Sequence, residues 1–103
     1  MAKVLYIVWY EVDPSVEKEW DAWMSSVHVP EVVKLGNFVT ARMYLVKEGS
    51  TARFATMYEA PDQATLQKYL EGPSQAVRED YSKRFGAKTR ITRTFLEETF
   101  ATG

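Results

Sequence analysis

The hydrophobic positions follow two different periods along the chain. Residues 3–12 are rich in β-branched and aromatic side chains, which predicts a strand. Both faces of this strand are apolar, with Val4, Tyr6, Val8, Tyr10 and Val12 on one and Leu5, Ile7 and Trp9 on the other. A strand with two apolar faces belongs in the middle of a sheet that is covered on both sides.

A helical period follows. Asp13-Pro14 is a strong helix start, and apolar residues then recur at helical spacing from Val16 to about residue 28. Pro30 disfavours the α conformation at the residue before it, so we expect a break or kink there. A further turn should end at Gly36, which we predict to be a left-handed cap.

The rest of the chain divides in the same way. Residues 38–47 and 52–59 alternate as two strands, with a turn at 48–50 between them. Helical stretches are predicted at 61–71 and 74–85, separated by Gly72-Pro73, and residues 90–98 form the last strand. The whole of 1–103 therefore reads as a single domain.

The predicted order βαββαβ is typical of the ferredoxin-like α+β fold. Its four-stranded antiparallel sheet carries both helices on one face and has the first and third strands at its centre. No segment is left to cover the other face. We therefore expect a homodimer, packed sheet to sheet as an α/β barrel.

Composition and charge exclude several functions. The formal net charge is −1, so no global field attracts nucleic acid. RNA-recognition domains share the βαββαβ order, but residues 53–58 lack the basic-glycine-aromatic opening of their motif. No stretch reaches the ~20 apolar residues of a membrane helix. The apolar start is interrupted by Glu11 and Asp13, which favours a strand over a signal peptide, so we expect a cytoplasmic protein with neither nucleic-acid nor membrane partners.

Several spaced residues carry a resemblance to a known group. They are Trp20-x-x-Trp23-Met24-x-x-x-His28-x-Pro30-Glu31-Val32, Gly36-x-Phe38, Ala41-Arg42 and Tyr81-x-x-Arg84-Phe85-Gly86. This pattern resembles an uncharacterised bacterial family of the dimeric α/β-barrel superfamily. The resemblance implies a ferredoxin-like dimer and brings no established reaction. The wider superfamily includes cofactor-free monooxygenases, polyketide cyclases, muconolactone-type isomerases, haem-degrading enzymes and ligand-sensing modules. Many of the cyclases have a histidine in the second helical stretch, which residues 71–76 lack.

His28 is the candidate catalytic residue. It is the only histidine, hence the only side chain that titrates near neutrality without perturbation, and it follows Trp20 and Met24 at four-residue steps. One interpretation is a general acid or base at the mouth of a pocket between helix and sheet. The other is a helix-end histidine that bonds to a free carbonyl or to the helix dipole.

Arg42, Tyr6, Tyr44, Tyr58 and Trp23 are the candidate substrate-binding residues. Arginine among aromatic side chains can hold a carboxylate or an enolate oxygen, and strand tyrosines can donate to a polarised oxygen. Each also has a structural interpretation, as an interface arginine, a packed tyrosine or a core tryptophan. With one histidine and no cysteine, we expect no metal site, and we predict no organic cofactor.

These observations predict a small-molecule enzyme that needs no cofactor. Its chemistry would be proton transfer, of the isomerase, cyclase or lyase type, on a small apolar or aromatic metabolite. One alternative is a non-catalytic module of the same fold that binds or senses such a ligand, and a more distant one is a cofactor-free monooxygenase. The motifs of serine hydrolases, dinucleotide-binding domains and P-loop proteins are absent from the sequence.

Overall fold

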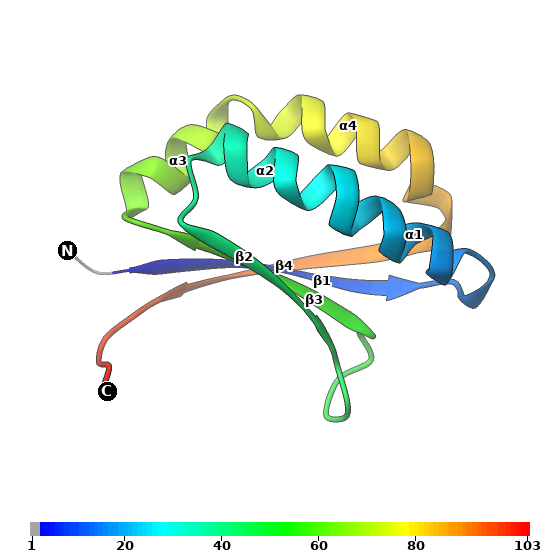
Figure 1. Ribbon diagram of the computed structural model, residues 1–103, viewed down its shortest axis with the longest axis horizontal. Helices are drawn as coiled ribbons and strands as arrows, with labels where there is room; N and C mark the ends of the chain where they lie inside the picture. The colour runs from blue at the N-terminus through cyan, green and yellow to red at the C-terminus, as the bar shows by residue number, and fades with distance from the viewer. Residues whose placement is uncertain (1–2) are drawn as a thin grey trace.

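The structure is a curved sheet with all its helices on one side (Figure 1). It is a computed structural model and describes residues 3–103, so the first two residues of the predicted domain lie outside it. In chain order the main elements are β1 (Val4–Val12), α1 (Glu17–Trp23), α2 (Val29–Gly36), β2 (Thr40–Leu45), β3 (Phe54–Ala60), α3 (Gln63–Glu71), α4 (Ser74–Phe85) and β4 (Thr89–Glu97). No helix in residues 3–103 is long and apolar enough to cross a membrane.

The sheet has the strand order β2-β3-β1-β4, and every neighbouring pair is antiparallel. The first and third strands are therefore central, which confirms the ferredoxin-like topology. In this register Tyr6 of β1 lies between Tyr58 of β3 and Phe95 of β4, all on the same face. The aromatic residues that the sequence spreads over three strands thus meet in one row.

Both helical regions begin at an aspartate, as the sequence indicates. The Asp13 carboxylate accepts a hydrogen bond from the Ser15 backbone N–H at 2.9 Å, ahead of a short 3-10 turn that leads into α1. Asp62 accepts from the Thr65 N–H at 2.8 Å at the start of α3. These side chains satisfy backbone donors that have no partner within the helix.

The predicted break before Pro30 does not occur. A π-helical turn, Met24–His28, joins α1 to α2, and Val29 keeps a helical conformation with φ −63° and ψ −46°. The Val29 N–H bonds to the Met24 carbonyl, five residues back. Pro30 then follows in the first turn of α2, so the wider π-helical turn stands where the proline ring and its missing N–H would disturb a regular α-helix. The helix therefore continues through Pro30, but the extra residue in the π-helical turn changes the direction in which the following side chains point.

The predicted cap at Gly36 is also corrected. Asn37 adopts the left-handed conformation, with φ 54°, while Gly36 is the last residue of α2. A glycine is needed there for a different reason, because the Phe38 ring lies 2.5 Å from the place a Cβ would occupy. Phe38 turns into the helix-covered core, so it does not share a sheet face with Arg42; β2 begins only at Thr40.

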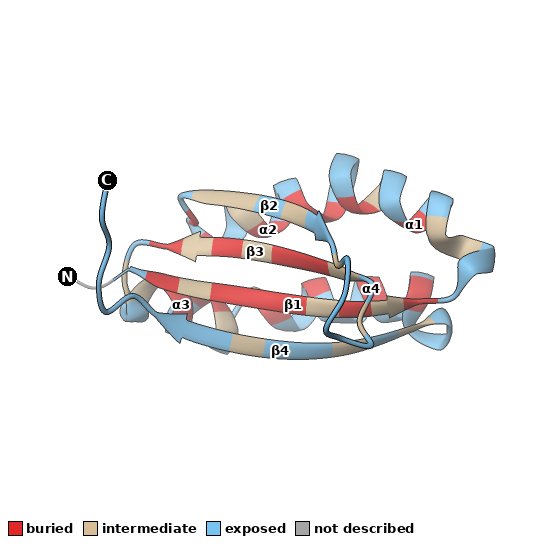
Figure 2. Cartoon of the chain, turned by 90° about the horizontal axis from the view of Figure 1, so that it is seen from below, coloured by how far each residue is buried: buried red, intermediate tan, exposed pale blue. Residues whose placement is uncertain are grey.

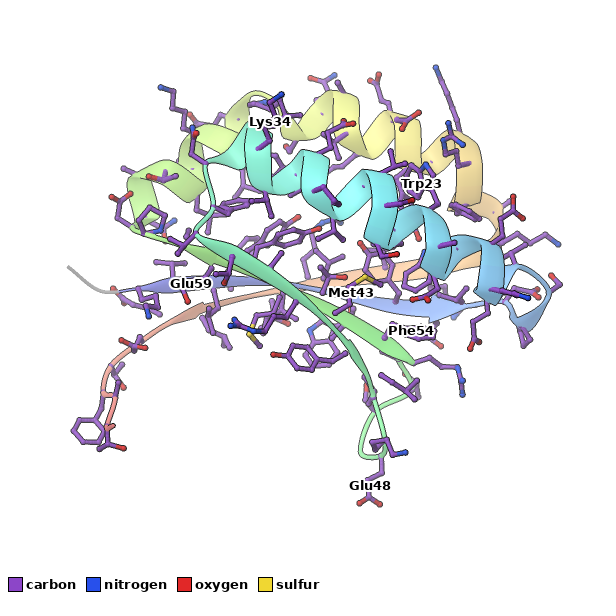
Figure 3. The ribbon with its side chains drawn as sticks, viewed as in Figure 1. Trp23, Lys34, Met43, Glu48, Phe54 and Glu59 are labelled. Atoms are coloured by element: carbon purple, nitrogen blue, oxygen red, sulfur yellow. The ribbon has the colours of Figure 1, made fainter. Side chains whose placement is uncertain are left out.

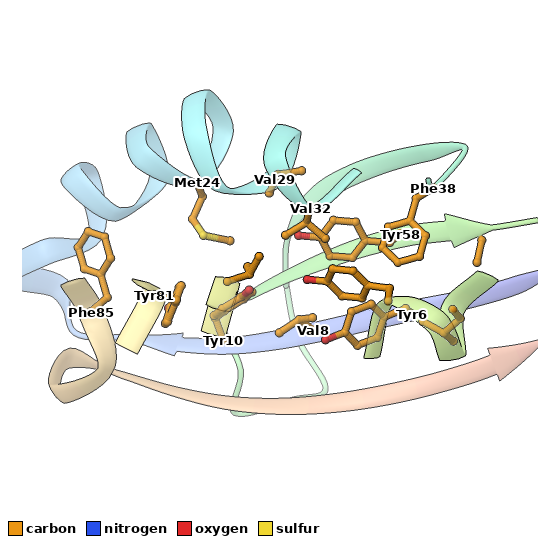
Figure 4. Close-up of a cluster of buried hydrophobic side chains, with 14 of the residues drawn as sticks. Tyr6, Val8, Tyr10, Met24, Val29, Val32, Phe38, Tyr58, Tyr81 and Phe85 are labelled. Atoms are coloured by element: carbon orange, nitrogen blue, oxygen red, sulfur yellow. The ribbon is translucent and has the colours of Figure 1, made fainter. Parts of the chain in front are cut away.

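The main core lies between the sheet and the helices. It contains the helix-facing side chains of β1, together with Trp20, Met24 and Leu66, which are fully buried (Figure 4). On the other face of β1, Ile7 is also buried although no helix covers it. Seen from that side, β1 and β3 are largely buried and β4 is largely exposed (Figure 2).

The helix-free face is flanked by two projecting segments. The loop between β2 and β3, with Glu48 at its tip, and the C-terminal residues both extend to the side away from the helices (Figures 1 and 3). Tyr44 and Leu96 remain 45% and 44% exposed on this face. It is therefore partly apolar and uncovered.

Candidate active site

A cavity of about 240 Å³ lies between the sheet and the helices. Its lining comes from β1, β3, β4, the π-helical turn and helices α2, α3 and α4. Five of the six tyrosines of the protein contribute to it, namely Tyr6, Tyr10, Tyr58, Tyr69 and Tyr81. The site is therefore an aromatic chamber with several hydroxyl groups. Such a concave, mostly apolar space with a few polar groups is the usual form of a small-molecule site.

The π-helical turn carries His28 into this chamber. The imidazole is 8% exposed, and its ring packs edge-on against Tyr81 at 5.4 Å and lies 5.1 Å from the Trp23 ring. Burial lowers the pKa of His28 to about 4, and the negative charge of Asp80 opposes this only in part. His28 is therefore neutral at pH 7 and able to accept a proton.

Tyr58 has a hydroxyl without a protein partner. The residue is 1% exposed, and its oxygen makes no hydrogen bond to any residue in the described part of the chain. Burial raises the pKa of this phenol well above its usual value, so the hydroxyl stays protonated and can only donate or accept as a neutral group. A buried tyrosine hydroxyl normally finds a partner. In Figure 4 it points toward Val32, another residue of the lining.

Two arginines stand at the edge of the cavity. The Arg93 Nε donates a hydrogen bond to the Tyr6 hydroxyl at 3.1 Å, and Arg78 reaches the lining from α4. Both residues are exposed, so they lie where the cavity opens to solvent. Burial raises the pKa of Tyr69, with smaller contributions from Tyr6 and from the negative charge of Glu31, and the charges of Arg78 and Arg93 counteract this rise. The two cations therefore act on the same part of the chamber.

A hydrogen-bond relay braces one wall of the chamber. The Trp20 Nε1 donates to the Tyr81 hydroxyl at 2.8 Å, and Tyr81 donates to the Thr89 Oγ1 at 3.0 Å. Thr89 in turn donates to the Phe85 carbonyl at 2.9 Å. The relay joins α1, α4 and the start of β4, so it holds the Tyr81 ring in place against His28.

The predicted site residues fall into three groups. His28, Tyr6 and Tyr58 line the same cavity. Trp23 lies outside the lining, but its ring packs against the His28 ring. The Arg84 guanidinium lies 5.2 Å from the centroid of the Trp23 ring.

Arg42 and Tyr44 form the third group and lie on the opposite side of the sheet. They pair with Met57 and Ala55, whose side chains face away from the helices. Because neighbouring side chains of a strand point to opposite faces, residues in this register cannot reach the chamber. The structure thus separates both from His28.

Sequence reasoning missed Arg78, Arg93, Tyr69 and Tyr81. One signal for Arg93 was available, since it alternates with Ile91 and Phe95 on the inner face of the last strand. Arg78 stands directly beside Val77 at the edge of the apolar stripe of its helix. No group of three or more histidine, cysteine, aspartate or glutamate side chains within residues 3–103 is placed to hold a metal ion.

Known structures share the fold at low sequence identity. A mutant of MhuD with two manganese protoporphyrin IX molecules bound per active site has a TM-score of 0.72 and 16% identity, covering 97% of this chain and 98% of its own. A mutant of SnoaB, a cofactor-independent oxygenase from Streptomyces nogalater, has a TM-score of 0.65 and 9% identity over 96% and 95%. A dimeric ferredoxin-like protein from an uncultured marine organism has a TM-score of 0.63 and 16% identity, covering 99% of this chain and 100% of its own.

Sequence comparison is more restricted. No curated protein matches the chain. One family model matches residues 3–99, which is nearly the whole length. This agrees with the resemblance to an uncharacterised family carried by the motif around His28. The chain belongs to the family described as Domain of unknown function (DUF4286).

Proposed function

We propose that this protein binds a small apolar or aromatic metabolite in the chamber and transfers a proton with His28 as the general base. The observation that carries the proposal is a buried, neutral imidazole in the same cavity as the unpartnered Tyr58 hydroxyl. A positioned general base contributes ~10²–10⁴-fold to a rate. The reaction class is isomerisation, cyclisation or elimination.

The chemistry starts with a C–H bond next to a carbonyl group of the substrate. The proton moves to a ring nitrogen of His28, and the electron pair of the C–H bond shifts to the carbonyl oxygen as an enolate. Tyr58, which stays protonated, donates a hydrogen bond to that oxygen. The imidazolium then returns its proton to another atom of the substrate, which completes an isomerisation. Alternatively the enolate expels a leaving group and the imidazolium gives its proton to that departing group, which completes an elimination.

The surroundings of His28 keep its imidazole in the base form. With its pKa lowered to about 4, the base form predominates throughout the neutral range. The proton becomes stable on the imidazole only when a negative charge forms beside it, and the enolate supplies that charge. We therefore expect activity of the free enzyme to fall as the pH approaches 4, rather than at the usual histidine value near 6.5.

A second candidate is cofactor-free oxygenation. The structural likeness to SnoaB, described as a cofactor-independent oxygenase, favours it. The first step is the same proton abstraction by His28, and dioxygen is the co-reactant. The carbanion carbon bonds to oxygen, the resulting peroxide takes the proton back, and loss of water converts the original CH₂ group to a carbonyl.

The test uses small ketones with acidic C–H bonds and the variant His28→Asn. Deuterium exchange into β-dicarbonyl and hydroxyaryl ketones is followed by NMR in D₂O, with Val27→Asn as the control because Val27 lies in the same turn but is 43% exposed. We expect His28→Asn to lose at least ~10²-fold in exchange rate and the control to lose none. An oxygen electrode separates the two candidates.

The outcomes differ clearly. Full exchange by His28→Asn contradicts the role of His28 as base. Binding of the ketones to the chamber with no exchange by the wild type indicates the alternative of a non-catalytic binding or sensing module.

We also propose that the helix-free face forms a homodimer. Ile7 is buried there without helix cover, Tyr44 and Leu96 are exposed, and the flanking loop and C-terminus project to that side. A similar structure is described as dimeric. Light scattering at micromolar concentration should give about twice the 11.9 kDa chain mass. Leu96→Asp should shift the mass toward one chain, and Val27→Asp on the helix side should not; a wild-type monomer contradicts the proposal.

A further inference from the structure

We infer that the ligand of the chamber is an aromatic carboxylate, with its ring among the tyrosines and its charged group at the opening between α4 and β4. Arg78 and Arg93 would hold that group. The inference rests on the proposed function, because it names the class of molecule that the same cavity takes.

The charges around the cavity point to an anion. Its lining includes two arginines and no aspartate or glutamate. Neither arginine forms an ion pair with a carboxylate of residues 3–103, whereas Arg53 pairs with Glu17 at 3.3 Å. The chain as a whole is slightly acidic, so this positive opening is a local arrangement. Unpaired arginines that face an apolar chamber favour a planar anion such as carboxylate.

Arg93 is held in position for such contact. Its Nε bonds to the Tyr6 hydroxyl at 3.1 Å, which leaves the two terminal nitrogens for a ligand. The Tyr6 ring itself is stacked between Tyr58, at 5.6 Å, and Phe95, at 5.3 Å with an interplanar angle of 8°. An arginine anchored to a packed aromatic row loses little freedom when it binds, which favours affinity.

A second, independent observation lies deeper in the chamber. The Tyr58 hydroxyl is buried and has no partner in the described part of the chain. A ligand oxygen that accepted a hydrogen bond from this hydroxyl would supply its missing partner. An apolar cavity of about 150 Å³ can bind benzene, so the volume of about 240 Å³ suits one ring with small substituents. The preferred ligand is therefore a single-ring carboxylate that carries a second oxygen.

The experiment compares an acid with its neutral amide. The probes are 4-hydroxybenzoate and 4-hydroxybenzamide, titrated into ¹⁵N-labelled protein and followed by NMR. The variants are Arg93→Gln and Arg78→Gln, with Arg93→Lys to retain the charge. Arg90→Gln is the control, because Arg90 also lies on β4 but its side chain is on the opposite face of the strand from Arg93 and points away from the chamber.

We expect the wild type to bind the acid roughly tenfold more tightly than the amide, the value of one charged hydrogen bond. Each glutamine variant should reduce that preference and leave amide binding unchanged. Arg93→Lys should retain part of the preference because it keeps the charge, and Arg90→Gln should retain it in full. Added salt should weaken binding of the acid only.

Three results overturn the inference. Equal affinity for acid and amide, with shifts at His28 and Tyr58, would mean that the chamber binds the ring but does not recognise a negative charge. Full acid preference in both glutamine variants would mean that neither arginine binds the carboxylate. The absence of any shift in the chamber with either probe contradicts the inference, whereas the proposed function is contradicted separately, by full ketone exchange in His28→Asn.

Discussion

Replacement of His28 by asparagine should change how the stability of the protein depends on pH. Folding buries the imidazole and lowers its pKa from about 6.5 to about 4. The unfolded chain therefore binds a proton more readily than the folded one. The corresponding stability is fully present above pH 6.5 and is lost as the pH falls toward 4.

The magnitude follows from these two values. Between pH 7 and pH 5 the imidazole of the unfolded chain becomes almost fully protonated while that of the folded protein stays neutral, which lowers the free energy of unfolding by about 2 kcal/mol. One to two kcal/mol is a large share of the stability of a small domain. His28→Asn lacks this titration, so its stability should fall less than that of the wild type over the same range.

Urea unfolding followed by tryptophan fluorescence measures the effect at pH 7, 6 and 5. The protomer concentration is kept constant, because the stability of a dimer depends on it. The carboxylates titrate in both proteins, so their contribution cancels when the two are subtracted. Val27→Asn, altered on the exposed side of the same turn, should follow the wild type.

Parallel stability curves for wild type and His28→Asn would refute the reasoning, as would an NMR titration of the His28 ring with a midpoint near 6.5. Either result would mean that the imidazole is exposed to water, and it would remove the physical basis for a neutral base in the chamber.

The remaining predictions concern packing and partners. Gly36→Ala should lower the free energy of unfolding by ~1–3 kcal/mol through contact with the Phe38 ring, less the gain in helix propensity; chemical denaturation measures it, and unchanged stability would mean that the ring moves freely. Tyr81→Phe should cost ~1–3 kcal/mol because it leaves the buried Trp20 Nε1 without its acceptor; unchanged stability in thermal unfolding would contradict the relay. Single-stranded RNA should not bind in fluorescence anisotropy at low salt; a micromolar, salt-dependent affinity would revive the RNA-recognition interpretation.

Local sequence patterns determined the elements and their order. Period-two alternation and helical spacing depend on neighbours a few residues apart, so residues 3–12 could be read as a strand without knowledge of the fold. The two apolar faces of that strand even placed it at the centre of the sheet, where the structure has it. His28 could be assigned to the buried side of its helix for the same reason.

Tertiary structure decided the conformation around Pro30 and Gly36. Pro30 directly follows a π-helical turn and Val29 stays helical, so the local rule for the residue before proline did not prevail. At Gly36 the constraint comes from the Phe38 ring, which folds back over the helix end. Neither effect is visible in the propensity of a single residue, because the first depends on the preceding π-helical turn and the second on where the Phe38 ring packs.

Which residues belong to the candidate site was also decided by the tertiary structure. Alternation along β2 shows that Arg42 and Tyr44 share a face, but only the side on which the helices pack determines that this face is turned away from His28. Arg93 and Tyr6 are 87 residues apart in the sequence and meet through the pairing of β1 with β4. Strand register and helix placement bring such residues together, and no short stretch of sequence encodes either one alone.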